Sequence, residues 1–382
     1  MSAPDSSQQP QLSQINVYPV KSVGGIALST SWVEKQGLTF DRRFMLATAD
    51  GQMVTARKFP QMVTVRSSLT ADGLVITAEG HAPLRLHYDA FKMQAASAQV
   101  WNDRFTAYTT TDEADDWFSA VIGQRVELLY TGEQSNRVRE KLGHNVSFAD
   151  GYPLLIISQA SLDELNRRSP ERHDMEQFRT NLVAGNTAPF EEDRWKRIRI
   201  GDVEFEAVKP CERCVLTTVE VEKGAFRRSK EPLQTLSQFR ANERGGVFFG
   251  QNLVAKNEGL IRQGDEIEVL EYKEPEFYAD KGQPSLSVVE APVQDSVKSL
   301  TISVNGNIFS GDNQRTLLEQ AEEAGIPMAN SCRAGLCGAC RVTVESGEVD
   351  QEDVPALHGF AHEPGLALAC CCVPKSDIEV IS

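Results

Sequence analysis

Six of the eight cysteines in this 382-residue chain lie near its C-terminus, in a spacing that could bind iron. Cys332, Cys337 and Cys340 follow the pattern C-x4-C-x2-C, and a run of three further cysteines begins at Cys370. Iron prefers soft thiolate ligands, and three thiolates from one loop with a fourth from a later segment complete a two-iron cluster. Glycines stand between the ligands, where the absence of Cβ lets backbone N–H groups turn toward the sulfur atoms. The pattern predicts a [2Fe–2S] centre, with buried or structural-zinc cysteines as the alternative.

The other two cysteines, Cys211 and Cys214, form a C-x2-C pair in the stretch VKPCERCVLTTVE. Alone, this pair could be a redox disulfide, half of a zinc site, or one metal ligand beside a cysteine that does not bind. The second half of a zinc site is missing, because the remaining cysteines are assigned to iron. The residues after the pair are β-prone, whereas a thioredoxin-like pair needs a helix there. We therefore expect one thiolate at a strand end, with Arg213 favouring its ionised form.

The composition is that of a globular chain with two or three domains, since 41% of the residues are hydrophobic. A total of 39 basic and 54 acidic residues gives a net charge of −15, which argues against nucleic acid or an anionic membrane as the main partner. The N-terminal stretch MSAPDSSQQPQLSQ lacks the apolar core of a secretory signal, and no apolar run approaches the roughly 20 residues of a membrane helix. We therefore expect a cytoplasmic protein whose cysteines bind metal or do chemistry.

Strand signals dominate the pattern of the chain. Asp-Gly or Asn-Gly pairs between β-prone runs predict hairpins at 43–59, 65–80 and 299–311. Helical spacing marks three segments, 112–123, 158–169 and 315–326. A further β-prone run covers 195–210, so the pattern predicts a β-rich α+β fold.

The segment 272–297 has the composition of a linker, because it loses periodicity and gathers Pro, Gly, Ser and charged residues. It separates the iron-binding pattern from the rest of the chain. Trp101, Trp117 and Trp195 lie among apolar patterns, and we expect all three in the core.

The C-terminal segment 298–382 resembles a plant-type [2Fe–2S] ferredoxin domain, with the C-x4-C-x2-C loop followed by LALACCCVP. In that family the last ligand stands two positions after a Leu, which selects Cys370 and leaves Cys371 and Cys372 as small buried residues. The resemblance implies a β-grasp fold whose cluster ligands are Cys332, Cys337, Cys340 and Cys370. Five basic and twelve acidic residues make the segment acidic, which suits a basic patch on a reductase.

Five motifs in the preceding part resemble the MOSC family of molybdenum-cofactor-binding proteins: VYPVKSVGGI, FDRRFML, EQFRTNLV, KPCERCVLTTVE and GQNLVAKNEGLIRQGDEIEVL. With the ferredoxin domain attached, the architecture is similar to that of the bacterial YcbX proteins, and the catalytic part resembles the mitochondrial amidoxime-reducing component. The resemblance implies a disordered N-terminus (1–12), a MOSC N-terminal β-barrel-like domain (13–95), a MOSC β-barrel domain (96–271), the linker (272–297) and the ferredoxin domain (298–382).

The same resemblance assigns site residues one by one. The cysteine of the Arg-Cys pair after K-P-C binds molybdenum in the family, which implies catalytic roles for Cys214 and, beside it at the cofactor, Arg213. The remaining cofactor contacts carried over are Lys21, Ser22 and Arg42 at the pterin phosphate, Arg179 and Asn181 of the R-x-N motif, and Asp150, Gly151 and Asn252. The chain departs from the family at Asn252, where the relatives carry Tyr. Cys211 is expected to be half buried and not a ligand.

Cationic side chains suit a phosphate, because guanidinium offers paired donors and Lys a point charge. Each also has a simpler interpretation. Lys21 could be a solvated loop residue, Arg42 a surface ion pair with Asp41, and Arg179 a cap at a helix end.

The resemblance implies a molybdenum-dependent reductase of N-hydroxylated compounds such as hydroxylamino bases and amidoximes. An NAD(P)H-dependent flavoprotein reductase would deliver electrons through the [2Fe–2S] domain to molybdenum at Cys214. One alternative is a non-catalytic carrier of the molybdenum cofactor or of sulfur. Another is a three-domain flavin reductase with the same C-terminal domain, but this would need a G-x-G-x-x-G dinucleotide turn, which the sequence does not contain.

Overall fold

The structure, a computed structural model, describes residues 9–139, 143–243, 245–282, 298–330, 335, 338–352, 354, 356–357 and 365–382. It divides into two compact units. Unit 1 comprises Met1–Cys211, Thr218–Arg227 and Phe249–Glu276, and unit 2 comprises Glu212–Thr217, Arg228–Phe248 and Phe277–Ser382. Strands greatly outnumber helices among the described residues, as the predicted β-rich α+β fold requires.

An eight-stranded sheet runs through unit 1 in the order β2-β1-β15-β14-β20-β17-β16-β22. Its strands are β1 (Gln11–Val17), β2 (Ile26–Leu28), β14 (Leu154–Ser158), β15 (Leu182–Gly185), β16 (Trp195–Ile200), β17 (Val203–Glu212), β20 (Phe248–Ala255) and β22 (Ile267–Tyr272). β14 and β15 run parallel. Alternation along β17 places Val203, Phe205 and Ala207 on one face, where they enter the main apolar core with Trp195.

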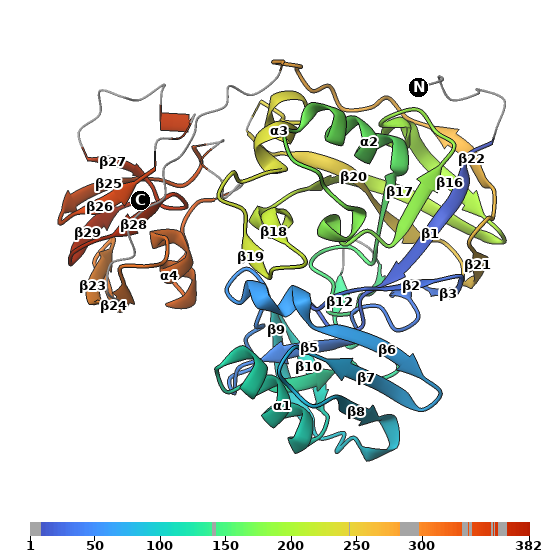
Figure 1. Cartoon of the computed structure of the whole chain (residues 1–382), viewed down its shortest axis with the longest axis horizontal. Coiled ribbons are helices and arrows are strands. Elements are labelled where there is room, and N and C mark those ends of the chain that lie inside the picture. Colours follow the sequence, from blue (N-terminus) through green and yellow to red (C-terminus); the bar gives the residue numbers. More distant parts are fainter. Residues whose placement is uncertain are drawn as a thin grey trace. The chain divides into compact units, whose positions relative to one another are not determined.

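Two smaller sheets form the N-terminal part of unit 1, in the orders β5-β11-β10-β9 and β6-β7-β8. Their strands are β5 (Phe44–Ala47), β6 (Arg66–Thr70), β7 (Gly73–Thr77), β8 (Leu84–His87), β9 (Ala95–Val100), β10 (Asp103–Thr109) and β11 (Glu127–Tyr130). Helix α1 (Asp112–Ile122) contacts β8 and β11, and Figure 1 shows it beside these sheets. The Thr111 side chain caps α1, and acidic residues in its first turn complement the helix dipole. β6 and β7 are the hairpin predicted at 65–80.

The remaining elements of unit 1 are short. They are β3 (Thr30–Glu34), β4 (Gly37–Leu38), β12 (Val138–Arg139), β13 (His144–Asn145), β18 (Val219–Glu220), β19 (Ala225–Phe226), β21 (Gly259–Arg262), α2 (Gln159–Arg168) and the 3-10 helices η1 (Pro60–Thr64), η2 (Tyr88–Ala90), η4 (Met175–Phe178) and η5 (Glu191–Arg194). The Ser158 side chain accepts a hydrogen bond from Ser161 N and so starts α2 one residue inside the predicted range.

Unit 2 contains α3 (Leu233–Phe239) and the C-terminal domain. A five-stranded sheet has the order β24-β23-β29-β25-β27, and β26 pairs with β28. The elements are β23 (Ser299–Val304), β24 (Asn307–Asp312), α4 (Leu317–Glu323), β25 (Arg341–Ser346), β26 (Val349–Gln351), β27 (Leu366–Leu368), β28 (Cys372–Pro374) and β29 (Ile378–Ile381). Asn305 and Gly306, both with positive φ, form the predicted turn between β23 and β24.

The tryptophan prediction is correct for one residue of the three. Trp195 is 1% exposed in the core of unit 1, whereas Trp117 is only half buried. Trp101 is 37% exposed, because it occupies the turn between β9 and β10 rather than a strand interior. Its apolar ring therefore lies on the surface of the site described below.

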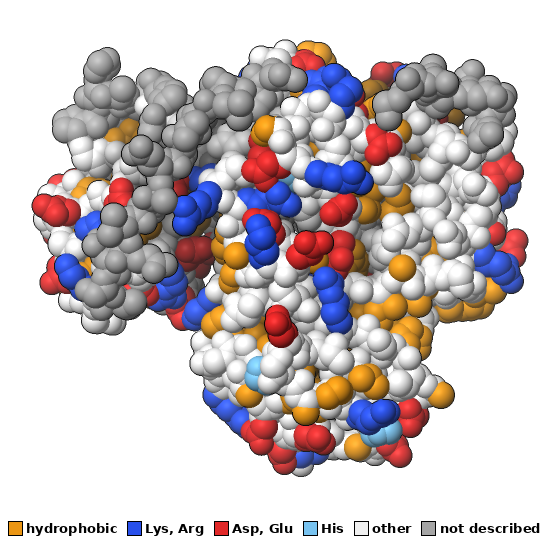
Figure 2. Space-filling model, viewed as in Figure 1, with side chains coloured by type: hydrophobic (Ala, Val, Ile, Leu, Met, Phe, Trp, Pro, Cys, Tyr) orange, Lys and Arg blue, Asp and Glu red, His pale blue; other side chains and the backbone are white. Residues whose placement is uncertain are grey.

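On the face shown in Figure 2, acidic and basic side chains are intermingled despite the net charge of the chain. None of the helices that the described residues form is both long and apolar enough to cross a bilayer.

Candidate functional site

Arg42, Arg179 and Asn181 lie together in unit 1, at the edge of the large sheet where β1 ends and β15 begins. Arg42 donates from Nη1 to Oδ1 of Asn181 at 3.0 Å and from Nη2 to the carbonyl oxygen of Arg179 at 3.0 Å. Its Nη1 also lies 2.6 Å from Oδ2 of Asp41, whose side chain is 1% exposed. The ion pair with Asp41 therefore exists, but it is buried rather than on the surface.

The ring of Tyr18 supports both guanidinium groups. Those of Arg42 and Arg179 lie 4.5 and 4.3 Å from the ring centroid. Arg42, Arg179 and Ser22 adopt left-handed backbone conformations, with φ of 49°, 53° and 68°. Such conformations cost a non-glycine residue free energy, and they persist where the surroundings over-determine them, often at binding sites.

Lys21 and Asp150 form a second group at the same edge of the sheet. Lys21 is buried, and its Nζ donates to the carbonyl oxygen of Phe148 at 2.9 Å and to Oδ1 of Asp150 at 2.7 Å. Burial lowers the pKa of Lys21 to about 8, although the charge of Asp150 opposes this shift. Burial alone would raise the pKa of Asp150, but the charges of Lys21 and Arg57 outweigh it and hold that pKa well below its usual range. Both members of the pair are therefore charged at neutral pH.

The two groups are linked through the backbone of one residue, Phe148. Phe148 N donates to the carbonyl oxygen of Arg42 at 3.0 Å, and the Phe148 carbonyl oxygen accepts from Lys21. Burial, together with the charge of Arg42, lowers the pKa of Arg179 to about 10, so Arg179 is still cationic at neutral pH. Its Nη2 is buried and has no hydrogen-bond partner among the described residues. Lys21, Arg42 and Arg179 thus form one cationic cluster with a donor available for an anion.

Three further residues surround Asp150, and none of them was predicted as a site residue. Trp101 Nε1 donates to Asp150 Oδ1 at 3.1 Å, and the Arg57 guanidinium lies 4.5 Å from the Trp101 ring centroid. Buried Arg137 donates from Nη2 to the Asp150 carbonyl oxygen at 3.0 Å. A signal for Trp101 was available, because the Asn-Asp pair that follows it is typical of a turn. Arg57 and Arg137 carried no such signal.

Gly151 and Asn252 complete the predicted set in unit 1. A Cβ on Gly151 would meet no atom within 4 Å among the described residues, so the space beside this glycine is open. Asn252 Nδ2 donates to the carbonyl oxygens of Lys209 and Pro210, at 3.4 and 3.3 Å. Asn252 thereby holds the end of β17 just before Cys211, which is half buried as expected.

Cys214 and Arg213 belong to unit 2 and follow directly after β17. Cys214 is half buried, and its carbonyl oxygen accepts from Thr217 N at 3.1 Å and from Thr217 Oγ1 at 2.9 Å. Arg213 is buried, and its N donates to the carbonyl oxygen of Val247 at 2.7 Å. Cys214 therefore lies in a turn at the end of β17. The hydrogen bonds from Thr217 to Cys214 and from Arg213 to Val247 hold this turn.

Two of the four cysteines expected to bind iron lie within the described residues, and they are adjacent. The Sγ atoms of Cys340 and Cys370 are 3.2 Å apart, and both residues are buried. Gly335 has φ of 71°, and a Cβ there would lie 2.7 Å from Cβ of Val354, so a side chain would disturb this loop. Cys371 and Cys372 are buried, as expected. Cys332 and Cys337 lie outside the described residues.

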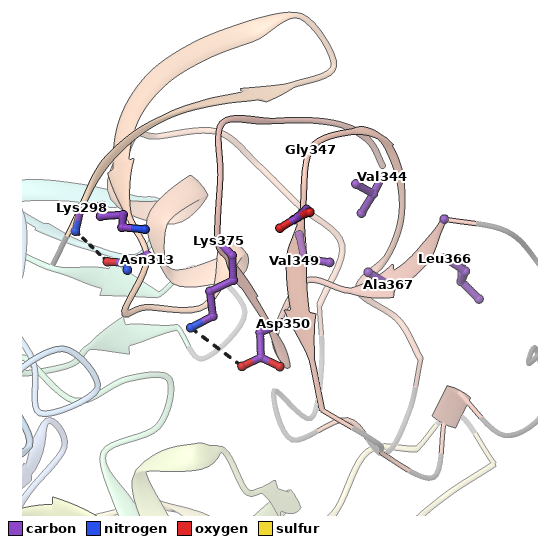
Figure 3. Close-up of a pocket in the computed structure, with 11 residues that line it drawn as sticks. Lys298, Asn313, Val344, Gly347, Val349, Asp350, Leu366, Ala367 and Lys375 are labelled. Carbon is purple, nitrogen blue, oxygen red and sulfur yellow. Dashed lines mark hydrogen bonds and ion pairs between the residues drawn. The ribbon is translucent and has the colours of Figure 1, made fainter. Parts of the chain in front are cut away.

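The C-terminal domain also carries a groove of about 770 Å³ (Figure 3). Among the residues that line the groove, Lys298 N donates to Oδ1 of Asn313, and Nζ of Lys375 lies 3.9 Å from Oδ2 of Asp350. None of the predicted site residues lines the groove.

Three domain families match the chain. They are the MOSC N-terminal beta barrel domain over residues 9–125, the MOSC domain over 143–268, and the 2Fe-2S iron-sulfur cluster binding domain over 301–375. Mitochondrial amidoxime reducing component 2 of Rattus norvegicus is 31% identical over 281 residues, which cover 67% of this chain and 82% of the relative.

The chain belongs to the MOSC family of the amidoxime-reducing components. Mitochondrial amidoxime-reducing component 1 of Homo sapiens is 30% identical over 279 residues, 68% of this chain and 82% of its own. Molybdenum cofactor sulfurase of Arabidopsis thaliana is 30% identical over 267 residues, which cover 63% of this chain and 32% of the sulfurase. These matches confirm the resemblance, the fold class and the order of the domains, while the predicted domain boundaries stay predictions.

The expected cofactors, a molybdenum cofactor and a [2Fe–2S] cluster, are those of the matched domains and relatives. The described residues fit both. The buried donor at Arg179 suits the phosphate of a pterin, and the adjacent thiols of Cys340 and Cys370 suit iron.

Proposed function

We propose that this chain reduces N-hydroxylated compounds, such as hydroxylamino bases and amidoximes, with electrons that pass through its own iron-sulfur domain. The observation that carries the proposal is the presence, in one chain, of a part related to amidoxime-reducing components and a 2Fe-2S domain. Conversion of R–NH–OH to R–NH2 and water takes two electrons and two protons, whereas a [2Fe–2S] cluster carries electrons singly. A second centre that holds an electron pair is therefore needed.

The proposed roles follow from the chemistry of the residues. The Cys214 thiolate would hold molybdenum, with Arg213 beside it at the cofactor, and the bound metal would supply a centre that accepts oxygen and two electrons. The remaining residues proposed to hold the pterin and its phosphate are Lys21, Ser22, Arg42, Asp150, Gly151, Arg179, Asn181 and Asn252. The Lys21–Asp150 pair would keep the ammonium group in one orientation, and the Arg42–Asn181 hydrogen bond would do the same for a guanidinium group.

The electron source that fits this arrangement is an NAD(P)H-dependent flavoprotein reductase, which converts hydride transfer into single electrons. The ligands proposed for the cluster that receives them are Cys332, Cys337, Cys340 and Cys370. Fusion of the two domains through the 272–297 linker would raise the effective concentration of the carrier at the molybdenum centre.

Metal analysis of the purified chain and of two cysteine variants tests the proposal. We expect molybdenum and about two irons per chain in the wild type, loss of molybdenum but not iron in Cys214→Ala, and retention of both metals in the matched control Cys211→Ala. Turnover of a hydroxylamino base with a flavoprotein reductase would follow. Iron without molybdenum, from a host that makes the cofactor, would contradict the proposal, and so would molybdenum retained in Cys214→Ala.

A carrier of the molybdenum cofactor or of sulfur is the second candidate, and the similarity to molybdenum cofactor sulfurase favours it. Such a carrier needs no electrons, so it would not explain the 2Fe-2S domain. Molybdenum at Cys214 without any reduction of N-hydroxylated compounds would support the carrier instead.

A further inference from the structure

A lysine from outside the C-terminal domain lies beside Cys371, the neighbour in sequence of a cysteine expected to bind iron. Lys230 precedes α3 in unit 2, and its side chain is 25% exposed. Its Nζ forms an ion pair with Glu352 and lies 3.7 Å from Sγ of Cys371. The Cys371 Sγ is itself 3.5 Å from Sγ of Cys370. A positive charge is therefore held one residue away from the proposed fourth iron ligand.

The backbone around Lys230 fixes this position. Lys230 has φ of 56°, a conformation that a residue other than Gly adopts only when its surroundings demand it. Its carbonyl oxygen accepts from Leu233 N at 3.0 Å and from Gln234 N at 3.3 Å at the start of α3. Next to it, the buried Glu231 carboxylate accepts from Thr235 N and Oγ1, which ties the turn to the helix.

Glu352 is held just as firmly on the other side of the contact. Its N donates to the carbonyl oxygen of Cys371 at 3.1 Å, directly after the pairing of β26 with β28. The Gln351 side chain donates to the same carbonyl oxygen and accepts from Leu368 N at 2.7 Å. Lys230 thus contacts the side chains of both Glu352 and Cys371, and the backbones of Glu352 and Cys371 are hydrogen-bonded to each other.

The stretch that carries Lys230 also supports the turn of Cys214. It runs from Arg228 to Phe248 within unit 2, and its Val247 carbonyl oxygen accepts from Arg213 N. At the end of the stretch, Phe248 N donates to the carbonyl oxygen of Arg240, the residue that follows α3. One short stretch therefore contacts the proposed molybdenum ligand's turn at one end and the neighbour of an iron ligand at the other.

We propose that the Arg228–Phe248 stretch is the internal docking surface for the iron-sulfur domain, and that Lys230 raises the reduction potential of the cluster. Reduction adds one negative charge to the cluster, and a cation a few ångströms away stabilises the reduced form more than the oxidised form. The inference rests on the cluster in the proposed function, but not on molybdenum or on any substrate. Lys230 acts here as a positioning and tuning residue.

A redox titration of the full chain, followed by the electron paramagnetic resonance signal of the reduced cluster, tests the inference. At the wild-type midpoint, we expect Lys230→Gln to lower the ratio of reduced to oxidised cluster roughly threefold to tenfold. This corresponds to a midpoint about 30–60 mV more negative, at 59 mV per tenfold change for one electron. In Lys230→Arg the ratio of reduced to oxidised cluster should stay within about twofold of the wild-type ratio, because arginine keeps the positive charge.

Two further variants separate a charge effect from a loss of structure. Glu352→Gln keeps Lys230 but removes its counter-charge, so the midpoint should shift in the opposite direction, to more positive values. Lys375→Gln is the matched control, because Lys375 is also paired with a carboxylate but lies at the groove of Figure 3. We expect Lys375→Gln to change the ratio of reduced to oxidised cluster, at the wild-type midpoint, by less than about twofold.

An unchanged midpoint in Lys230→Gln would overturn the inference, because a domain that is not docked on this stretch would not respond to a charge 141 positions away from Cys371. Shifts of the same sign in Lys230→Gln and Glu352→Gln would also overturn it. Opposite shifts, in a protein that reduces no N-hydroxylated compound, would sustain the docking surface while the proposed function fails.

Discussion

Replacement of Arg42 by Met should destabilise unit 1 by about 3–5 kcal/mol, because it leaves a buried carboxylate without its cation. Asp41 is 1% exposed and accepts from Arg42 Nη1 at 2.6 and 2.8 Å as well as from Tyr18 N at 2.8 Å. The same guanidinium donates to Asn181 and to the Arg179 carbonyl oxygen, and each lost hydrogen bond costs about 1 kcal/mol. These losses place the expected value toward the upper end of the range.

Tryptophan fluorescence can report this effect for unit 1 alone. All four tryptophans lie between residues 32 and 195, within unit 1. Protein from a host that cannot make the molybdenum cofactor should be used, because a bound ligand would add its own stabilisation. With about 2–4 °C per kcal/mol for a domain of this size, the melting temperature should fall by roughly 6–20 °C.

Arg197→Met is the matched control, since Arg197 pairs with Glu204 at 2.8 Å but the two side chains are 44% and 34% exposed. It should cost no more than about 1 kcal/mol. The double variant Asp41→Asn with Arg42→Met should recover part of the loss, because both charges are then absent. Equal effects of Arg42→Met and Arg197→Met would refute the claim that burial makes the Arg42–Asp41 pair costly to break.

Three other predictions concern separate features. Burial lowers the pKa of Lys21 to about 8, so Lys21 loses its charge as the pH rises from 7 to 9. The protein should therefore lose more molybdenum on desalting at pH 9 than at pH 7, and Lys21→Arg should prevent most of this loss. Equal losses of molybdenum from the wild type and from Lys21→Arg at pH 9 would contradict this prediction. Phe205→Ala should lower the free energy of unfolding, measured in urea, by about 3–5 kcal/mol. Val208→Ala, at a 38% exposed position of the same strand, should change this free energy by no more than about 0.5 kcal/mol. Similar costs for the two variants would count against the assigned core. Cys370→Ser should abolish or alter the paramagnetic signal of the reduced cluster and Cys371→Ser should not, while the reverse result would reassign the fourth ligand.

Local pattern was sufficient to predict several of the elements and the families of the domains. The segments 112–123 and 158–169 are helices, and the Asn305-Gly306 turn joins two strands, because spacing and turn chemistry act between near neighbours. The cysteine spacing and the five MOSC motifs likewise lie in short stretches, and the family matches confirm what they indicate. The roles of the individual site residues stay predictions.

Tertiary structure alone decided which of these residues meet and how deeply they are buried. Asp150 lies 129 positions from Lys21, and Asn181 lies 139 positions from Arg42, so their contacts depend on the sheet register that brings the ends of β1, β14 and β15 together. Trp101 looked like a core residue because its neighbours are apolar, yet its place in a turn exposes it beside Asp150. Burial and long-range contact are properties of packing between distant segments, and the pattern of near neighbours in a sequence does not encode them.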